Sequence, residues 1–498
     1  MNGSPALTTA DAPVAAAVEP GRRGRLLFVV HQFFPQFHSG TETLCERVAR
    51  ICTAAGWHVD IITSVMVDAA AIAAFRDSPF CDDAAREILS DERPELSRQF
   101  SYDYAPGIRV HAFTHSHDPA YGRPRFGREV SDPAIERFVE ALLDAADYHR
   151  AAVFHQLHFP LAALETIRER GVPLSFVATD FFAVCPLGSQ QLEDGRHCAG
   201  QGPGSIACIR HLSDRTGWLE WFIQNYPGIL IAPYLHLYRA LGPWPKLPVH
   251  PHQNLYYLLR RNRDSLRFLK SCDVIVAPTS SVAESLRGAG VPDHRITHLA
   301  YGMPPASIPA PPVRRAGSPV RLCYAGQTTE RKGLHVLLEA LRRLPEDCDW
   351  TLDVWGNFDH GGAYARACRA EAEAMAPRVA LKGTFQSYRI HEVLDGYDYL
   401  VIPSTWAENL PLVLLSALQI ALPVIVSDAQ GLLDAFPDGR VHGRSFRMGD
   451  AEDLARVLRE EMRIRPEYRA ELAPVIPSVQ DFAAALLNIP DLSLVGEG

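Results

Sequence analysis

The sequence lacks both a long apolar run and an excess of basic residues. Its best candidate for a membrane span, Pro411–Val426, is too short and is interrupted by Ser416 and Pro423. The formal net charge at pH 7 is -9, whereas a nucleic-acid-binding protein needs a basic surface to contact phosphates. We therefore expect no nucleic-acid partner, and a protein that is soluble or, at most, peripheral to a membrane.

We expect no secretory leader at the start of the sequence. Residues 1–24 are rich in Ala and Pro and have no continuous apolar core, so we predict a disordered tail there. The 10 cysteines then belong to a chain that we expect to work in the reducing cytoplasm. In that compartment, clustered cysteines indicate a metal site before they indicate disulfides.

Two common nucleotide-binding motifs are absent as well. Neither half of the chain has the G-x-G-x-x-G fingerprint after its first predicted strand, and no G-x-x-x-x-G-K-[ST] loop occurs anywhere. A dehydrogenase or a P-loop enzyme is therefore disfavoured.

What the sequence does contain is a strand–helix–strand pattern in each half. Leu26–Val30 has strand length, Thr41–Ala55 is amphipathic, and Val59–Thr63 is a second predicted strand. The same order restarts later, with strands predicted at 273–277, 320–325, 350–355, 379–382, 399–402 and 423–427. The chain has 498 residues, more than one hydrophobic core usually supports. The predicted fold class is α/β, with two Rossmann-like doubly wound domains facing each other across a cleft.

The predicted domain boundaries follow these patterns. The first domain is expected at 25–268, with an irregular insertion at about 185–262, and the second at 269–465. Residues 466–498 are expected to form closing helices that pack back on the first domain.

The first candidate site motif is Gly-Gln-Thr-Thr-Glu-Arg-Lys-Gly at 326–333, between the predicted strand 320–325 and a helix. The free N–H groups and dipole of a helix N-terminus favour an anion, and Lys332 adds a full positive charge. This arrangement favours a diphosphate site. The alternative is a solvated Lys–Arg pair on a surface helix.

The second motif is Pro-Ser-Thr-Trp-Ala-Glu-Asn-Leu-Pro-Leu-Val at 403–413, which also lies between a strand and a helix. The carboxyl edge of an open parallel sheet is where ligands bind in such folds. Glu408 can accept hydrogen bonds from sugar hydroxyls there, or it can simply be an acid favoured by the helix dipole. Because both motifs follow strands in matching order, we favour the functional interpretation.

At these residues, the stretch from about 270 to 460 resembles the nucleotide-binding domain of the family four glycosyltransferases (glycosyl transferases group 1). That family has the GT-B fold, retains the anomeric configuration and carries an E-x7-E hallmark. Glu408 matches the first glutamate, which contacts the donor sugar, and Lys332 matches the diphosphate lysine. The resemblance implies further donor contacts from Gly40, Gln327, Arg331, Asn409, Leu412, Val413 and Ser416.

The chain departs from the family pattern at two of these positions. Ser416 stands where the second glutamate would hold the ribose hydroxyls, so a charge-assisted contact of roughly 1.5–3 kcal/mol is lost. Gln327 stands where many relatives have an arginine beside the diphosphate, and Arg331 is a candidate to replace it.

The first half resembles the family less sharply. Ser39-Gly40-Thr41-Glu42 is similar to its G-G-x-E loop, although a simple helix cap explains much of this pattern. The resemblance implies acceptor-side roles for Thr41, Thr179 and Asp180, with Thr179 in place of a histidine. His158 is a candidate to compensate, and the alternative is a structural histidine at a strand end.

The middle of the chain contains two further features. Cys185, Cys198, Cys208 and His211 have residue types and spacing that suit a structural zinc site, although buried free cysteines are also common. Trp218–Tyr257 is rich in aromatic residues and is followed by arginines, which fits a membrane contact or a helical insertion.

The family resemblance implies a retaining hexosyltransferase for polysaccharide assembly. It would move a sugar from a nucleoside diphosphate to a glycan or lipid-linked acceptor, without any cofactor required for catalysis. Lys332 and helix amides would neutralise the leaving diphosphate while Glu408 orients the sugar. The alternatives are a glycosyltransferase-like scaffold with little activity and a nucleotide-sugar epimerase, and the context of Glu408 disfavours the epimerase.

Overall fold

The structure is a computed structural model of the whole chain. It describes residues 22–35, 37, 39–66, 69–90, 98–115, 125–192, 198, 200, 205–212, 230, 233, 250–306, 318–359, 362–435, 442–464 and 476–495. Most of the aromatic stretch predicted to contact a membrane lies outside these residues, as does nearly all of the predicted tail. No helix among the described residues is long and apolar enough to cross a membrane.

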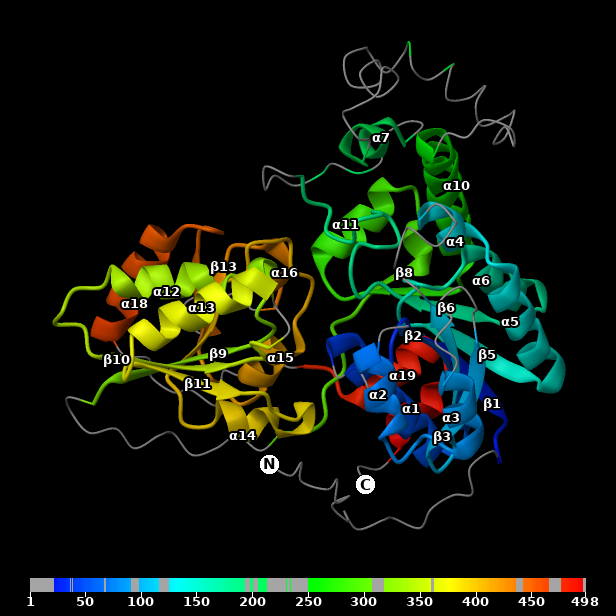
Figure 1. Cartoon of the computed structure of the whole chain (residues 1–498), viewed down its shortest axis with the longest axis horizontal. Coiled ribbons are helices and arrows are strands. Elements are labelled where there is room, and N and C mark those ends of the chain that lie inside the picture. Colours follow the sequence, from blue (N-terminus) through cyan, green and yellow to red (C-terminus); the bar gives the residue numbers. More distant parts are fainter. Residues whose placement is uncertain are drawn as a thin grey trace.

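The first lobe is built on an eight-stranded sheet (Figure 1). Its strands, in spatial order, are β3 (Gln99–Ala105), β4 (Ile108–His115), β2 (His58–Met66), β1 (Arg25–Val29), β5 (Tyr148–Val153), β6 (Leu174–Val177), β7 (Val274–Ala277) and β8 (Ile296–His298). All neighbours are parallel except β3 and β4, which form an antiparallel pair at one edge. The second lobe has a wholly parallel six-stranded sheet of β11 (Val379–Gly383), β10 (Trp350–Trp355), β9 (Val320–Ala325), β12 (Tyr399–Ile402), β13 (Val424–Ser427) and β14 (Gly443–Phe446).

The central strands are apolar along their whole length because helices cover both faces of the sheet. In β1, Leu26 and Phe28 belong to one buried cluster, and Leu27 and Val29 belong to the cluster on the opposite face. The second of these clusters is covered by α5 (Pro133–Ala145), α6 (Leu161–Glu169), α10 (His250–Ser271) and α11 (Ser280–Gly288). The first is covered by α1 (Gly40–Ala54), α2 (Ala69–Arg76), α3 (Asp83–Ser90) and α19 (Val479–Leu487). In the second lobe, α12 (Leu334–Arg342), α13 (Gly362–Ala374) and α18 (Ala451–Ile464) cover one face.

The two lobes share one apolar cluster. It runs from Val276 of β7 through Phe482 of α19 to Leu414 of α15 (Leu412–Gln419) and also includes α14 (Ile390–Leu394). The structure also contains the short helices α4 (Arg125–Val130), α7 (Ile206–Leu212) and α16 (Gln430–Leu433).

The C-terminal helix α19 lies on the first lobe. It packs against α1 and against β5, β6 and β7, and Figure 1 shows it in red beside the blue α1. The Ser478 side chain accepts a hydrogen bond from the Asp481 amide at its start, and Asn488 ends it in the left-handed conformation.

The predicted boundary between the domains was wrong. The strand expected to open the second domain is β7, and it pairs with β6 in the first sheet, as β8 then pairs with β7. The chain therefore changes sheet between His298 and Val320, not near residue 268. The expected insertion at about 185–262 also overlaps α10, a 22-residue helix that belongs to the first lobe.

Candidate active site between the two lobes

The two sequence motifs of the second lobe meet at the carboxyl edge of its sheet. The loop 326–333 follows β9, the loop 403–411 follows β12, and these two strands are parallel neighbours. The loops are joined by two hydrogen bonds from Thr405, whose amide donates to the Arg331 carbonyl at 2.9 Å and whose hydroxyl donates to the Glu330 carbonyl at 2.9 Å.

Lys332 and Glu408 form an ion pair at this junction. The Nζ of Lys332 lies 2.6 Å from Oε1 of Glu408, and the hydroxyl of Ser404 donates to the same oxygen at 2.6 Å. The Glu408 residue is 4% exposed, whereas 26% of the Lys332 side chain is exposed. A buried carboxylate is stable only when such donors compensate its lost hydration. The two residues that the sequence singled out most strongly are therefore in direct contact.

A glycine makes this contact geometrically feasible. Lys332 ends a single 3-10 turn, and Gly333 follows with φ +69° before α12 begins at Leu334. A Cβ at Gly333 would lie 1.8 Å from the Pro403 carbonyl oxygen, so only glycine allows the loops to approach so closely. The sequence predicts Lys332 at the start of the α-helix, but it lies in the turn before it.

Trp406 lies beside the pair. The charged groups of Arg331 and Lys332 are 5.4 Å and 5.5 Å from the centre of its ring, which is within cation–π range. Arg331 and Gln327 are both exposed.

The amino ends of two helices face each other across the lobes. Leu412 begins α15, Gly40 begins α1, and a Cβ at Gly40 would lie 3.8 Å from the Leu412 side chain. The first amides of a helix have no partner within the helix and attract anions. Leu412 and Val413, which the sequence assigns to a diphosphate, are thus at the start of a helix that points at the other lobe.

Asn409 links the lobes through its side chain. Its Oδ1 accepts from the Thr279 hydroxyl at 3.0 Å, and its Nδ2 donates to the Ala178 carbonyl at 2.9 Å and to the Tyr301 hydroxyl at 3.1 Å. All three partners belong to the first lobe, and Asn409 is 5% exposed. The sequence predicts a donor contact here, whereas the hydrogen bonds that it makes in the structure join the two lobes.

Ser416 lies one turn inside α15. Its hydroxyl donates to the Leu412 carbonyl at 2.9 Å, and the residue is 1% exposed. The hydroxyl is therefore already used within its own helix.

The first lobe presents a group of histidines and carboxylates at the carboxyl ends of its strands. Nδ1 of His155 accepts from the Leu157 amide at 3.0 Å, so the proton of the neutral ring is on Nε2, which is 3.1 Å from Oδ2 of Asp180. The rings of His155 and His31 are 4.3 Å apart, and Nε2 of His31 is 3.6 Å from Oε1 of Glu42. Of these, only Asp180 is among the predicted site residues.

Burial controls the charges of this group. It lowers the pKa of His31 well below the ordinary value, and His155 and His115 lower it further. Burial also raises the pKa of Glu42, against a hydrogen bond from the Ser39 hydroxyl. A sequence signal for this group existed, because His31 and His155 each follow the end of a strand within two residues.

The remaining acceptor-side predictions are spread around this group. His158 has φ 67° and stacks on His115 at 4.1 Å between ring centres. The Thr179 hydroxyl donates to the Phe154 carbonyl at 3.1 Å, and Thr41 lies in the first turn of α1.

The predicted zinc site is not supported. Among the described residues, which include all four predicted ligands, no group of three or more His, Cys, Asp or Glu side chains is arranged to hold a metal ion. Cys185, Cys198 and Cys208 are free thiols. Burial, and then the proximity of Cys185, raises the pKa of Cys208 to about 11. The spacing in the sequence suits zinc, but the fold does not bring the side chains together with His211.

Comparison with known families identifies the part of the chain that carries Lys332 and Glu408. Residues 311–474 match the model of glycosyl transferases group 1. This stretch is similar to the glycosyl transferases group 1 family. The match ends short of α19 and excludes all the strands of the first sheet.

The curated relatives of the chain are distant. The amylovoran biosynthesis glycosyltransferase AmsK of Erwinia amylovora is 25% identical over 229 residues, which are 44% of this chain and 54% of that protein. A sulfoquinovosyl transferase of Arabidopsis thaliana is 24% identical over 253 residues, covering 47% of this chain and 48% of its own. The chain thus spans about half the length of the curated relatives that it matches.

Solved structures match over nearly the whole chain. Sucrose-phosphate synthase from Thermosynechococcus elongatus has a TM-score of 0.55 at 16% identity, covering 95% of this chain and 97% of that one. HepE from Anabaena, solved in complex with UDP-glucose, has a TM-score of 0.53 at 13% identity with the same coverage. These likenesses show that the two lobes together form the GT-B fold predicted from the sequence.

Proposed function

We propose that the chain is a retaining glycosyltransferase that moves a hexose from a nucleoside diphosphate to a glycan or lipid-linked acceptor. The observation that carries this proposal is the ion pair of Lys332 and Glu408 beside the amino end of α15. It combines a cation, the amino end of a helix and a buried carboxylate at one edge of a parallel sheet, which suits a diphosphate joined to a sugar.

The donor diphosphate would take Lys332 and the first amides of α15 as its partners. Leu412 and Val413 offer their amides, and Gly40 leaves room for the phosphate between the two helices. Gln327 and Arg331 would line the rim, with Trp406 holding Arg331 in place. Asn409 would act as a positioning residue, because its bonds to the first lobe fix the loop that carries Glu408.

Glu408 would orient the sugar through its hydroxyls. In the reaction, the bond from the anomeric carbon to the diphosphate oxygen breaks, and a bond to the acceptor oxygen forms on the same face. The acceptor proton passes to the leaving diphosphate oxygen, so the protein needs no nucleophile. Lys332 and the helix amides stabilise the charge that develops on the diphosphate, which is the largest contribution expected from the protein.

The acceptor would bind along the first lobe, near Asp180, His155 and Glu42. Asp180 holds the His155 ring through a hydrogen bond, and Glu42 is buried at the amino end of α1. Thr41, His158 and Thr179 are further candidates at this edge. Because relatives are named for amylovoran and colanic acid biosynthesis, we propose a growing polysaccharide or its lipid-linked precursor as the acceptor.

The donor site is tested by a thermal-shift panel of nucleoside diphosphates and their sugars, starting with UDP-glucose. Wild type is compared with Lys332→Ala and with Lys382→Ala, a control that removes a lysine paired with Asp353 at 3.3 Å on the second sheet. We expect one nucleotide to stabilise wild type and Lys382→Ala but not Lys332→Ala. No stabilisation by any nucleotide, or equal loss in both variants, would contradict the assignment.

A scaffold with a weak or inactive site is the second candidate. It is favoured by Ser416, whose hydroxyl is bonded within α15 and which supplies no carboxylate for the ribose. Incubation of donor and a mixed glycan acceptor pool separates the two, since an enzyme releases nucleoside diphosphate over time. Nucleotide binding without release would favour the scaffold.

A further inference from the structure

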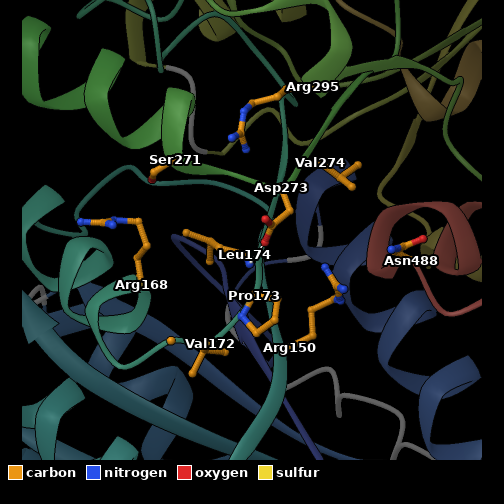
Figure 2. Close-up of a pocket in the computed structure, with 11 residues that line it drawn as sticks. Arg150, Arg168, Val172, Pro173, Leu174, Ser271, Asp273, Val274, Arg295 and Asn488 are labelled. Atoms are coloured by element: carbon orange, nitrogen blue, oxygen red, sulfur yellow. Dashed lines mark hydrogen bonds between the residues drawn. The ribbon is translucent and has the colours of Figure 1, made fainter.

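A cavity lies at the opposite edge of the first sheet from the proposed active site. It has a volume of about 660 Å³ and is bounded by the starts of β6 and β7, the residue before β8, and the loop after α19. Figure 2 shows its lining, with Arg295 above Asp273, Arg150 on the side nearer Asn488, and Arg168 on the other side. Cavities of this size suit small organic ligands.

The lining of this cavity is strongly cationic. It contains three arginines, Arg150, Arg168 and Arg295, and a single acid, Asp273. The three guanidinium charges less one carboxylate leave a formal charge of +2. One oxygen of Asp273, Oδ2, already accepts a hydrogen bond from the Leu174 amide at 2.9 Å. The rest of the chain has a net negative charge, so this concentration of cations is local.

Arg150 is partly buried, and the carboxylate of Asp273 favours its charged form. Its Nε and Nη1 atoms are buried and reach no hydrogen-bond acceptor among the described residues. Leaving such donors unpaired is costly, and buried arginines are normally matched by a carboxylate or a carbonyl. By contrast, Arg295 donates to the Cys272 carbonyl, and Arg168 lies 3.9 Å from Glu165.

We propose that this cavity binds a small molecule through a phosphate monoester group. Arg150, Arg168 and Arg295 each bring a guanidinium charge to the lining, and guanidinium groups bind phosphate oxygens strongly. A phosphate monoester carries a charge of about -1.5 to -2 at pH 7, which balances the +2 of the lining. The volume beyond the phosphate leaves room for an organic part that reaches toward Asn488.

The site is separate from the proposed donor site. Lys332 and Glu408 lie at the carboxyl edge of the second sheet, whereas this cavity is at the amino ends of strands in the first. A ligand here would contact both the sheet and the end of α19, the helix that closes the chain on the first lobe. Binding of a ligand in this cavity would not require the proposed transferase activity.

The test is a calorimetric titration with glucose 6-phosphate, with vesicles containing phosphatidic acid as a second arm. Wild type is compared with Arg150→Gln, Arg168→Ala and Arg170→Ala. Arg170 is the matched control, because it is paired with Asp144 at 2.6 Å, is 45% exposed and does not line the cavity. A Lys332→Ala variant separates this site from the donor site.

We expect the dissociation constant to rise about tenfold or more in Arg150→Gln and to rise also in Arg168→Ala. The dissociation constant should change less than about twofold in Arg170→Ala and in Lys332→Ala, because neither Arg170 nor Lys332 lines the cavity. Binding of the soluble ester identifies a metabolite as the source of the phosphate, and binding only to vesicles identifies a lipid headgroup. No binding in either arm, or binding that survives in both Arg150→Gln and Arg168→Ala, would overturn the proposal. Arg168 is 41% exposed, so its variant should fold even if Arg150→Gln does not.

Discussion

The side chain of Asn409 gives the sharpest prediction about how the two lobes are held together. Asn409→Ala removes three hydrogen bonds, to Thr279, Ala178 and Tyr301, from a residue that is 5% exposed. A buried hydrogen bond contributes about 1 kcal/mol net, so the substitution should cost about 3 kcal/mol of stability. The loss should be concentrated at the contact between the lobes, because every partner belongs to the first lobe.

The assay is urea denaturation of Asn409→Ala beside Asn357→Ala. Asn357 is the control, since its Oδ1 accepts one local bond from the Asp359 amide at 2.8 Å, and its loss should cost less than about 1 kcal/mol. A double-mutant cycle with Tyr301→Phe then isolates one bond, with an expected coupling of about 1 kcal/mol. A cost below about 1 kcal/mol for Asn409→Ala, with unchanged denaturation slope, would refute the idea that this side chain joins the lobes. If nucleotide affinity then fell instead, the donor contact predicted from the sequence would be the better account.

Three further predictions concern the active-site loops and the buried histidine. Gly333→Ala should destabilise the protein by about 2 kcal/mol or more in thermal unfolding, because its Cβ would lie 1.8 Å from the Pro403 oxygen. Gly449→Ala is the control, because Gly449 has φ +75° but an added Cβ would have no atom within 4 Å, so this variant should lose only the stability that backbone strain costs. Equal losses of stability in Gly333→Ala and Gly449→Ala would contradict the argument from the Pro403 contact. Glu408→Gln should reduce turnover about 10²-fold or more in a donor-consumption assay while the protein stays folded, since the charge on the carboxylate is lost but its size is kept; unchanged turnover would remove Glu408 from the site. The pKa of His31 is lower in the native state than in the unfolded chain, so below pH 6.5 the unfolded chain binds a proton at His31 and the native state does not. The free energy of unfolding should therefore fall as the pH drops from 6.5 toward the native pKa of His31. In His31→Gln the slope of the free energy of unfolding against pH, measured from denaturation curves, should be smaller by up to about 1.4 kcal/mol per pH unit. Parallel pH profiles for wild type and His31→Gln would show that His31 is not neutral in the native state. The raised pKa of Glu42 has the opposite effect, because it makes the free energy of unfolding fall as the pH rises above 4.5. The comparison of wild type with His31→Gln is therefore repeated with Glu42→Gln present in both proteins.

The sequence alone was enough for the fold class, and it predicted that Lys332 and Glu408 lie at one edge of the second sheet. Strands such as β1 are buried on both faces, so their continuous apolar runs identify a parallel sheet without any knowledge of their neighbours. Lys332 and Glu408 were found because each follows a strand, and parallel strands deliver their loops to one edge. The structure adds that they are in contact across 76 residues of sequence.

Only the tertiary structure decided which strands pair and which side chains converge. An apolar run at 274–277 fits either sheet, and the pairing of β7 with β6 placed it in the first. Spacing could not show that Cys185, Cys198, Cys208 and His211 are not arranged around a metal, because ligand geometry depends on how distant segments fold. The same holds for the arginine cavity, whose charges come from separate segments of the chain. Periodicity and local motifs are properties of neighbouring residues, whereas contacts between remote residues are fixed by packing.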